Sequence, residues 1–131
     1  MTTAKRSLTV LVVDDEALLR WSIGELLRRS GYSVTEAMSA NQAREAMTHT
    51  TAPIDVALLD YRLADSNDLQ LLDEVRRRQP QSAVVVMTAH ATPELVQASL
   101  ERGAYCVLGK PFDLYQLEGL LADACQASGY Q

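Results

Sequence analysis

The chain has 131 residues, which fits a single domain whose one core buries roughly two-thirds of the unfolded surface. Apolar residues make up 47% and charged residues 22%, an ordinary globular composition that argues against disorder. The formal net charge of −5 lacks the basic footprint of a nucleic-acid binder, so we expect no direct nucleic-acid binding by this domain.

Apolar runs and helical patterns alternate along the chain. Four apolar runs and the short segment 32–36 predict five strands. Most of the apolar runs are rich in valine, leucine and isoleucine, as in a sheet that is covered on both faces. The predicted strands span residues 8–13, 32–36, 54–59, 83–87 and 105–108.

The helical patterns between these runs carry start and stop signals of their own. Gly31 and Gly103 are expected to end the first and fourth helices, because glycine readily adopts the left-handed backbone of a helix C-terminus. The second helix opens at Ser39 with capping-box spacing. The other expected N-caps are Ser66 or Asn67 for the third helix, Thr92 for the fourth and Asp113 for the fifth.

Five strand–helix units without an internal linker or repeat predict an α/β fold. Right-handed crossovers place helices on both faces of a parallel sheet, and the natural solution is a doubly wound, five-stranded sheet of order 2-1-3-4-5 in a three-layer, flavodoxin-like sandwich. We expect residues 1–131 to form this one domain, with its core at about 8–127 and the start of a linker at 128–131.

Polar residues follow four of the predicted strands. Asp14 and Asp15 come after the first strand, Asp60 after the third, Thr88 after the fourth and Lys110 after the fifth. Ligands bind outside the carboxyl ends of parallel strands, so these side chains are expected to share one pocket. Three acids, a hydroxyl and an ammonium suit a divalent cation and a phosphoryl group.

Other residues bear on the cellular location of the protein rather than on its chemistry. Lys5 and Arg6 precede an apolar run, but the acids at 14–16 follow too soon for a signal-peptide core or a membrane span, so we expect no membrane contact. Cys106 and Cys125 form no C-x-x-C pair and are interpreted as small buried hydrophobes in a reducing cytoplasm.

Four motifs together carry a family resemblance over Leu8 to Ala127. The stretches Val12–Glu16, Leu58–Asp60, Val86–Ala89 and Lys110–Phe112, in that order, resemble the receiver domain of bacterial two-component response regulators. The blocks 87–90, 103–104 and 110–113 are most similar to receivers of the enhancer-binding transcriptional activators.

The resemblance implies a role for each residue of the expected pocket. Asp60 would be the nucleophile that takes a phosphoryl group from a phosphohistidine of a sensor histidine kinase. Asp15 and Asp60 would ligate Mg²⁺ directly, Asp14 mostly through water, and the backbone carbonyl of Arg62 would complete the protein ligands. The domain would be consumed as a reactant, with slow autodephosphorylation, rather than turn over as an enzyme.

Two further residues are implied at the same pocket. Lys110, before an expected cis peptide bond to Pro111, would neutralise phosphoryl oxygens, and Thr88 would donate its hydroxyl beside the small Ala89. Simpler interpretations remain: the acids could cap turns or the first helix, and Thr88 and Lys110 could be an ordinary strand residue and a solvated lysine. His49 and His90 lack companions at ligand spacing and are not expected to bind metal.

Competing functions differ at identifiable positions. An aspartate-nucleophile phosphohydrolase resembling the haloacid dehalogenases needs an acid two residues after its nucleophile, where this chain has Arg62. A flavin-binding carrier needs a glycine- or hydroxyl-rich loop after the first strand, which is absent from the sequence. A stand-alone relay protein without DNA output stays open.

Three positions depart from the common receiver pattern. Ala64 and Asp68 stand where most receivers have proline and glycine, which puts the rigidity of that loop in question, and Val107 replaces the usual aromatic switch residue. Tyr105, two residues upstream and on the same side of the strand, is expected to take part of the switching role with Thr88. The implied docking face for an output domain, a partner or a second copy comprises the fourth helix, fifth strand and fifth helix.

Overall fold

The computed structural model describes residues 7–66 and 69–127, so the possible cap Asn67, the departure at Asp68 and the expected linker at 128–131 lie outside it. Its strands and helices alternate throughout. In chain order they are β1 Thr9–Val13, α1 Ala17–Arg29, β2 Ser33–Ala37, α2 Ala40–His49, β3 Val56–Asp60, α3 Gln70–Arg78, β4 Ala83–Thr88, α4 Pro93–Glu101, β5 Cys106–Gly109 and α5 Leu114–Ala127.

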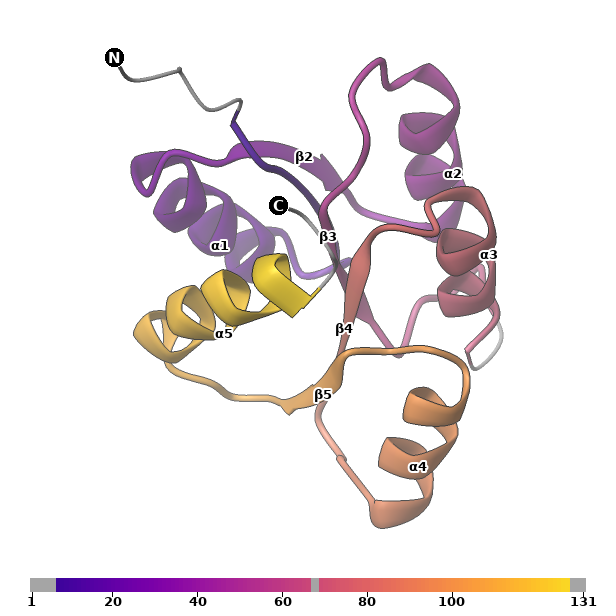
Figure 1. The fold of residues 1–131 in the computed structure, drawn as a ribbon. Coiled ribbons are helices and arrows are strands. Elements are labelled where there is room, and N and C mark those ends of the chain that lie inside the picture. Colours follow the sequence, from indigo (N-terminus) through magenta and orange to yellow (C-terminus); the bar gives the residue numbers. More distant parts are fainter. Residues whose placement is uncertain (1–6, 67–68, 128–131) are drawn as a thin grey trace.

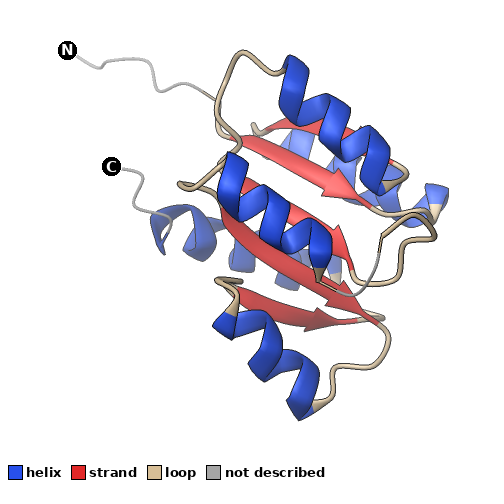
Figure 2. Ribbon diagram, turned by 90° about the vertical axis from the view of Figure 1, so that its right-hand side faces the viewer, coloured by secondary structure: helices blue, strands red, loops and turns tan. Residues whose placement is uncertain are grey.

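The five strands form one parallel sheet of order β2-β1-β3-β4-β5, which confirms the predicted topology. Helices α1 and α5 cover one face of the sheet, and α2, α3 and α4 cover the other (Figure 1). All strands point the same way, and the described chain starts and ends on the side opposite the strand tips (Figure 2). Among the described residues, no helix combines the length and the apolar character that crossing a membrane requires.

The core consists of two apolar layers separated by the sheet. Every residue of β1, β3 and β4 is buried, which explains their unbroken apolar sequences. Successive residues of β1 point to opposite layers: Val10 and Val12 pack with α1 and α5, and Leu11 and Val13 pack with α2 and α3. Each such side chain contributes about 1.5–3 kcal/mol by leaving water. The sheet is therefore a rigid frame for whatever its ends carry.

Most of the predicted helix ends are confirmed. The Ser39 and Thr92 hydroxyls accept hydrogen bonds from Gln42 N and Leu95 N, at 3.1 and 3.2 Å. The other predicted ends also hold: Gly31 and Gly103 adopt φ values of 96° and 93° past α1 and α4, and Asp113 Oδ1 accepts from Tyr115 N at 2.8 Å.

The expected cap at Ser66 is wrong. Helix α3 begins only at Gln70, its N-terminal residue Leu69 makes no side-chain capping hydrogen bond, and the buried Ser66 hydroxyl has no partner among the described residues. Leu63 and Leu69, which lie on either side of Ser66, are both buried in the core. Burial of these two leucines displaces the helix start beyond the capping signal.

Candidate functional site

The polar residues expected to converge do so at the carboxyl edge of the sheet. The parallel register aligns Val13 with Leu59, Asp60 with Met87 and Thr88 with Gly109, so the ends of β1, β3, β4 and β5 lie side by side. Carboxylate oxygens of Asp14, Asp15 and Asp60 all lie within 4.8 Å of one another. Asp14 and Asp60 are buried, whereas Asp15 faces solvent.

Lys110 reaches into this cluster from the segment after β5. Its Nζ lies 2.8 Å from Asp14 Oδ2, 3.0 Å from Glu16 Oε1 and 3.4 Å from Asp60 Oδ1. Burial alone lowers the pKa of Lys110, but the hydrogen bonds to Asp14 and Glu16 outweigh it and raise that pKa above its usual range. Lys110 is thus a fixed positive charge, and Glu16 is a member of the cluster that the sequence pattern did not reveal.

Asp60 is held in an environment that disfavours its charge. Burial, followed by repulsion from Asp14, raises the pKa of Asp60 from 3.8 to about 6, although Lys110 and a hydrogen bond from Arg62 N partly oppose the rise. The Arg62 N–H lies 3.4 Å from Asp60 Oδ1, a weak contact. Asp60 is therefore an acid whose ionised form gains from any added positive charge.

Thr88 lies beside the acids at the end of β4. It is 3% exposed, and its Oγ1 accepts a hydrogen bond from His90 N at 3.1 Å. A hydroxyl in that role still has its own proton to donate. Ala89, His90 and Arg62 are exposed around the cluster. A pocket beside it opens to solvent and is lined by Glu16, Leu19, Ala89, Lys110, Pro111 and Phe112.

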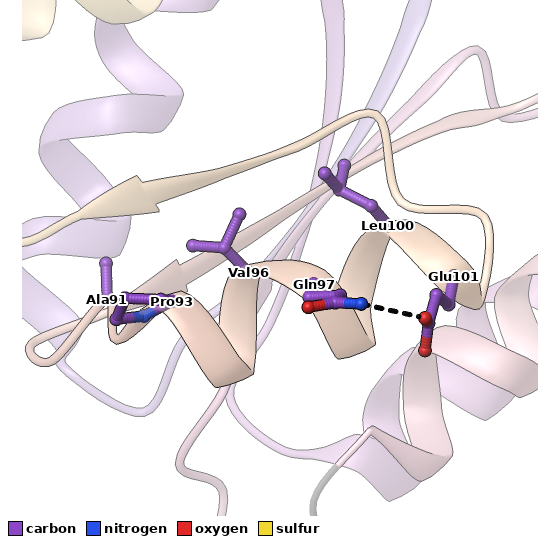
Figure 3. A pocket seen from close by; sticks show the side chains of 6 residues that line it. All are labelled: Ala91, Pro93, Val96, Gln97, Leu100 and Glu101. Carbon is purple, nitrogen blue, oxygen red and sulfur yellow. Dashed lines mark hydrogen bonds between the residues drawn. The ribbon is translucent and has the colours of Figure 1, made fainter.

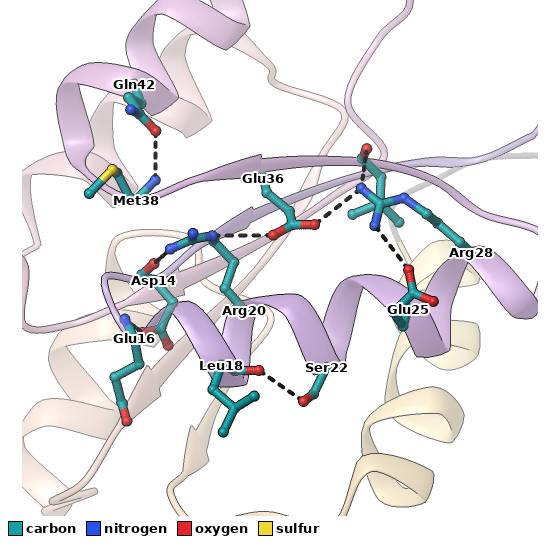
Figure 4. Close-up of polar contacts among 11 residues, drawn as sticks. Asp14, Glu16, Leu18, Arg20, Ser22, Glu25, Arg28, Glu36, Met38 and Gln42 are labelled. Atoms are coloured by element: carbon teal, nitrogen blue, oxygen red, sulfur yellow. Dashed lines mark hydrogen bonds and ion pairs between the residues drawn. The ribbon is translucent and has the colours of Figure 1, made fainter.

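A network on the β2 side fixes the loop that carries the first two acids (Figure 4). Arg20 donates from Nη1 to the backbone oxygen of Asp14 at 2.8 Å and from Nε to Glu36 Oε1 at 3.2 Å. The second oxygen of Glu36 pairs with Arg28 at 3.1 Å. Asp14 N also donates to Ala37 O at 3.0 Å. Both backbone polar groups of Asp14 are therefore held by β2 or α1.

The remaining predicted residues do not contribute side chains to the acid cluster. Val107 is partly buried against the layer formed with α2, α3 and α4, and Tyr105, just before β5, is 36% exposed. The Lys110–Pro111 peptide bond is cis, as the resemblance implied. His49 and His90 are exposed, and the only group of potential metal ligands found in 7–66 and 69–127 does not include them.

The donor set suits a hard divalent cation. The three grouped residues offer only carboxylate oxygens, the ligands that Mg²⁺ prefers, and the raised pKa of Asp60 reflects negative charge that a cation would relieve. Asp14, Asp15 and Asp60 therefore fit as residues that would hold this ion.

A parallel sheet of this order with acids, a threonine and a lysine at its carboxyl edge defines a class of signalling domain. Residues 10–122 match the family described as the response regulator receiver domain, and the chain belongs to that family. It is 34% identical over 110 residues to the DNA-binding transcriptional regulator NtrC of Klebsiella pneumoniae, which covers 84% of this chain and 23% of that protein.

Other relatives agree in class. The chain is 34% identical over 114 residues to the response regulator protein PilR of Pseudomonas aeruginosa, covering 87% of this chain and 25% of that protein. The structure of NtrX from Brucella abortus superimposes with a TM-score of 0.85 at 28% identity, covering 95% of this chain and 28% of that one. A receiver domain protein from Methanospirillum hungatei shares the fold, with a TM-score of 0.87 over 95% and 98% of the two chains at 23% identity. The chain thus spans about a quarter of the length of the curated relatives.

Proposed function

We propose that this domain accepts a phosphoryl group from a sensor histidine kinase onto Asp60, in a Mg²⁺-dependent reaction, and relays the signal to transcription regulation. The observation that carries the proposal is the position of the Asp60 carboxylate, which lies within 4.8 Å of the carboxylates of Asp14 and Asp15 and 3.4 Å from Lys110 Nζ. Family membership and the NtrC and PilR relatives support the same conclusion.

The residues of the site supply most of what the transfer needs. An ionised Asp60 oxygen attacks phosphorus, the bond from phosphorus to the donor imidazole nitrogen breaks, and the histidine leaves with its electron pair. A pKa of about 6 leaves Asp60 mainly ionised above pH 7. Lys110 neutralises phosphoryl oxygens as charge spreads, and Thr88 donates its hydroxyl to one of them. Mg²⁺ held by Asp14, Asp15 and Asp60 would supply further charge neutralisation at this edge.

The same geometry supports a reactant rather than a turnover hydrolase. Two residues past Asp60, where a haloacid dehalogenase-type hydrolase has its general acid, Arg62 is exposed to solvent. Without that acid, no dedicated side chain takes the proton from a water that attacks the acyl phosphate, so phosphorylated Asp60 is expected to hydrolyse slowly and by itself. We expect the domain to act in the cytoplasm, where a histidine kinase exposes its phosphohistidine.

The output face is proposed on α4, β5 and α5. A shallow apolar pocket runs along α4 over Ala91, Pro93, Val96 and Leu100, and Gln97 and Glu101 border it with a hydrogen bond between them (Figure 3). Leu100 is 48% exposed. An output domain, a partner protein or a second copy of the chain is expected to dock there after phosphorylation.

Acceptor chemistry is tested with a small phosphodonor. We expect acetyl phosphate to add one phosphoryl mass to the wild type in Mg²⁺ but not in chelator, and peptide mapping to place it on Asp60. Asp60→Asn should stay unmodified. Modification of Asp60→Asn at the wild-type rate, or labelling that ignores Mg²⁺, would overturn the proposal.

A further inference from the structure

The loop after Asp60 is tethered to a helix from another part of the chain. Asp65 lies between β3 and α3, yet its Oδ1 accepts a hydrogen bond from Ala40 N and its Oδ2 accepts one from Asn41 N, both at 2.9 Å. These two N–H groups belong to the first turn of α2, which is 25 and 24 residues away in the sequence. One carboxylate therefore closes two otherwise unpaired donors of a helix end.

The hydrogen bonds that form this tether are stronger than hydrogen bonds between neutral groups. A carboxylate that accepts from backbone N–H groups at a helix N-terminus gains from charge-assisted hydrogen bonds and from the helix dipole. The backbone hydrogen bonds from Ala40 and Asn41 lower the pKa of Asp65, so it remains ionised at neutral pH. The helix has a separate cap of its own, because Ser39 Oγ accepts from Gln42 N at 3.1 Å.

The start of α2 is also joined to the first acidic loop. Helix α2 follows β2 after two residues, and the last residue of β2, Ala37, accepts the backbone hydrogen bond from Asp14. The turn between β2 and α2 thus contacts the Asp14 loop on one side and, through Asp65, the Asp60 loop on the other. The second loop lacks the proline and glycine that commonly stiffen it, since it has Ala64 and Asp68 there.

We propose that Asp65 is a positioning residue for the metal site: its bridge to α2 holds the backbone of the loop that carries the Arg62 carbonyl at the correct distance from Asp14 and Asp15. Loss of the bridge leaves Asp60 anchored in β3 but frees the segment beyond it. Mg²⁺ binding weakens as a result, while the acceptor chemistry at saturating Mg²⁺ is kept. This inference rests on the proposed function for the identity of the metal.

The test measures Mg²⁺ binding to the unphosphorylated full chain by isothermal titration calorimetry. Loss of a residue that orients metal ligands typically weakens metal affinity 10- to 100-fold, and for Asp65→Ala we expect a Kd about tenfold above wild type. Ser39→Ala is the matched control: it removes a hydrogen bond from the same helix end without touching the acceptor loop. It should lower the melting temperature comparably but leave the Mg²⁺ Kd within about twofold of wild type.

Asp65→Asn separates the tether from simple charge. Substitution by asparagine removes the same charge as substitution by alanine but keeps one oxygen that can accept a hydrogen bond from Ala40 N or Asn41 N. The Mg²⁺ Kd of Asp65→Asn should therefore fall between those of wild type and Asp65→Ala. Equal Kd values for Asp65→Asn and Asp65→Ala would show a charge effect and overturn the proposal, as would equal shifts in Asp65→Ala and Ser39→Ala. If Asp65→Ala does not fold, Asp65→Asn is compared with the control instead. A Mg²⁺ Kd for Asp65→Asn no higher than that of Ser39→Ala would then overturn the proposal.

Acetyl phosphate labelling keeps this inference distinct from the proposed function. At saturating Mg²⁺, Asp65→Ala should reach a labelling rate within about twofold of wild type, with only its Mg²⁺ requirement raised. A wild type that binds Mg²⁺ but is not labelled on Asp60 would refute the acceptor function, whereas the calorimetric comparison would still decide the role of Asp65.

Discussion

Replacing Asp60 by asparagine is expected to stabilise the metal-free protein. Asp60 is 8% exposed, and burial together with the Asp14 carboxylate raises its pKa from 3.8 to about 6. A folded-state pKa above the unfolded value means that the folded protein binds the proton more tightly. The ionised form therefore reduces stability above pH 6, and this penalty disappears as the pH falls through 6 toward 4.

The size of the effect follows from the shift. About two pKa units at 1.36 kcal/mol each set an upper limit of about 3 kcal/mol on the amount by which ionised Asp60 lowers the free energy of unfolding. Solvent relaxation at the open edge of the sheet reduces this penalty. Asparagine has nearly the same shape and no charge. We expect Asp60→Asn to be more stable than wild type by about 1–3 kcal/mol at pH 8, and equal to it near pH 4.

Urea unfolding in chelator at a series of pH values measures this difference. Asp65 and Glu74, whose pKa values are lowered by hydrogen bonds, lose their stabilising contributions as the pH falls, but equally in both proteins. Asp15→Asn is a suitable comparison, because exposed Asp15 should give a smaller gain. Equal stabilities of wild type and Asp60→Asn at pH 8, or a gap that widens on acidification, would refute the reasoning. Saturating Mg²⁺ should reverse the order, since it binds only the folded wild type tightly.

Three more outcomes are expected. Ser99→Ala should raise the free energy of unfolding by about 0.5–1 kcal/mol in urea, because the buried Ser99 hydroxyl has no partner among the described residues; a loss of stability would contradict this. Arg62→Ala with His90→Ala should shorten the lifetime of phosphorylated Asp60, measured by loss of the added mass. Both residues are exposed and their backbone N–H groups contact Asp60 and Thr88, so we expect their side chains to hinder attacking water, and equal decay would exclude shielding. Tyr105→Leu should weaken phosphorylation-dependent association in light scattering and Val107→Tyr should not, and unchanged association in Tyr105→Leu would assign that ring to packing.

The convergence of the site was predictable because it depends on local features. A polar residue directly after an apolar run lies at a strand end, and parallel strands bring their carboxyl ends to one edge. That reasoning placed Asp14, Asp60, Thr88 and Lys110 together, and all four meet in the structure.

Contacts between distant segments were not predictable in this way. Three contacts illustrate this: Glu16 with Lys110, Arg20 with the Asp14 carbonyl, and Asp65 with the start of α2. In the sequence these three charged residues resemble ordinary surface residues. Their partners are chosen by how the helices pack, which no local period encodes. The error at Ser66 has the same origin, since burial of leucines on either side of it moved the helix start.

The placement of the first and last described residues has a consequence for assembly into larger proteins. The described chain enters through β1 and leaves through α5 on the side of the sheet opposite the acid cluster (Figure 2). A domain joined directly at residue 7 or residue 127 would begin on the side of the sheet opposite Asp60 and its phosphoryl donor. Such a receiver domain can be joined to different proteins without changes at its reactive edge, provided that each of them binds a face of the domain that phosphorylation alters.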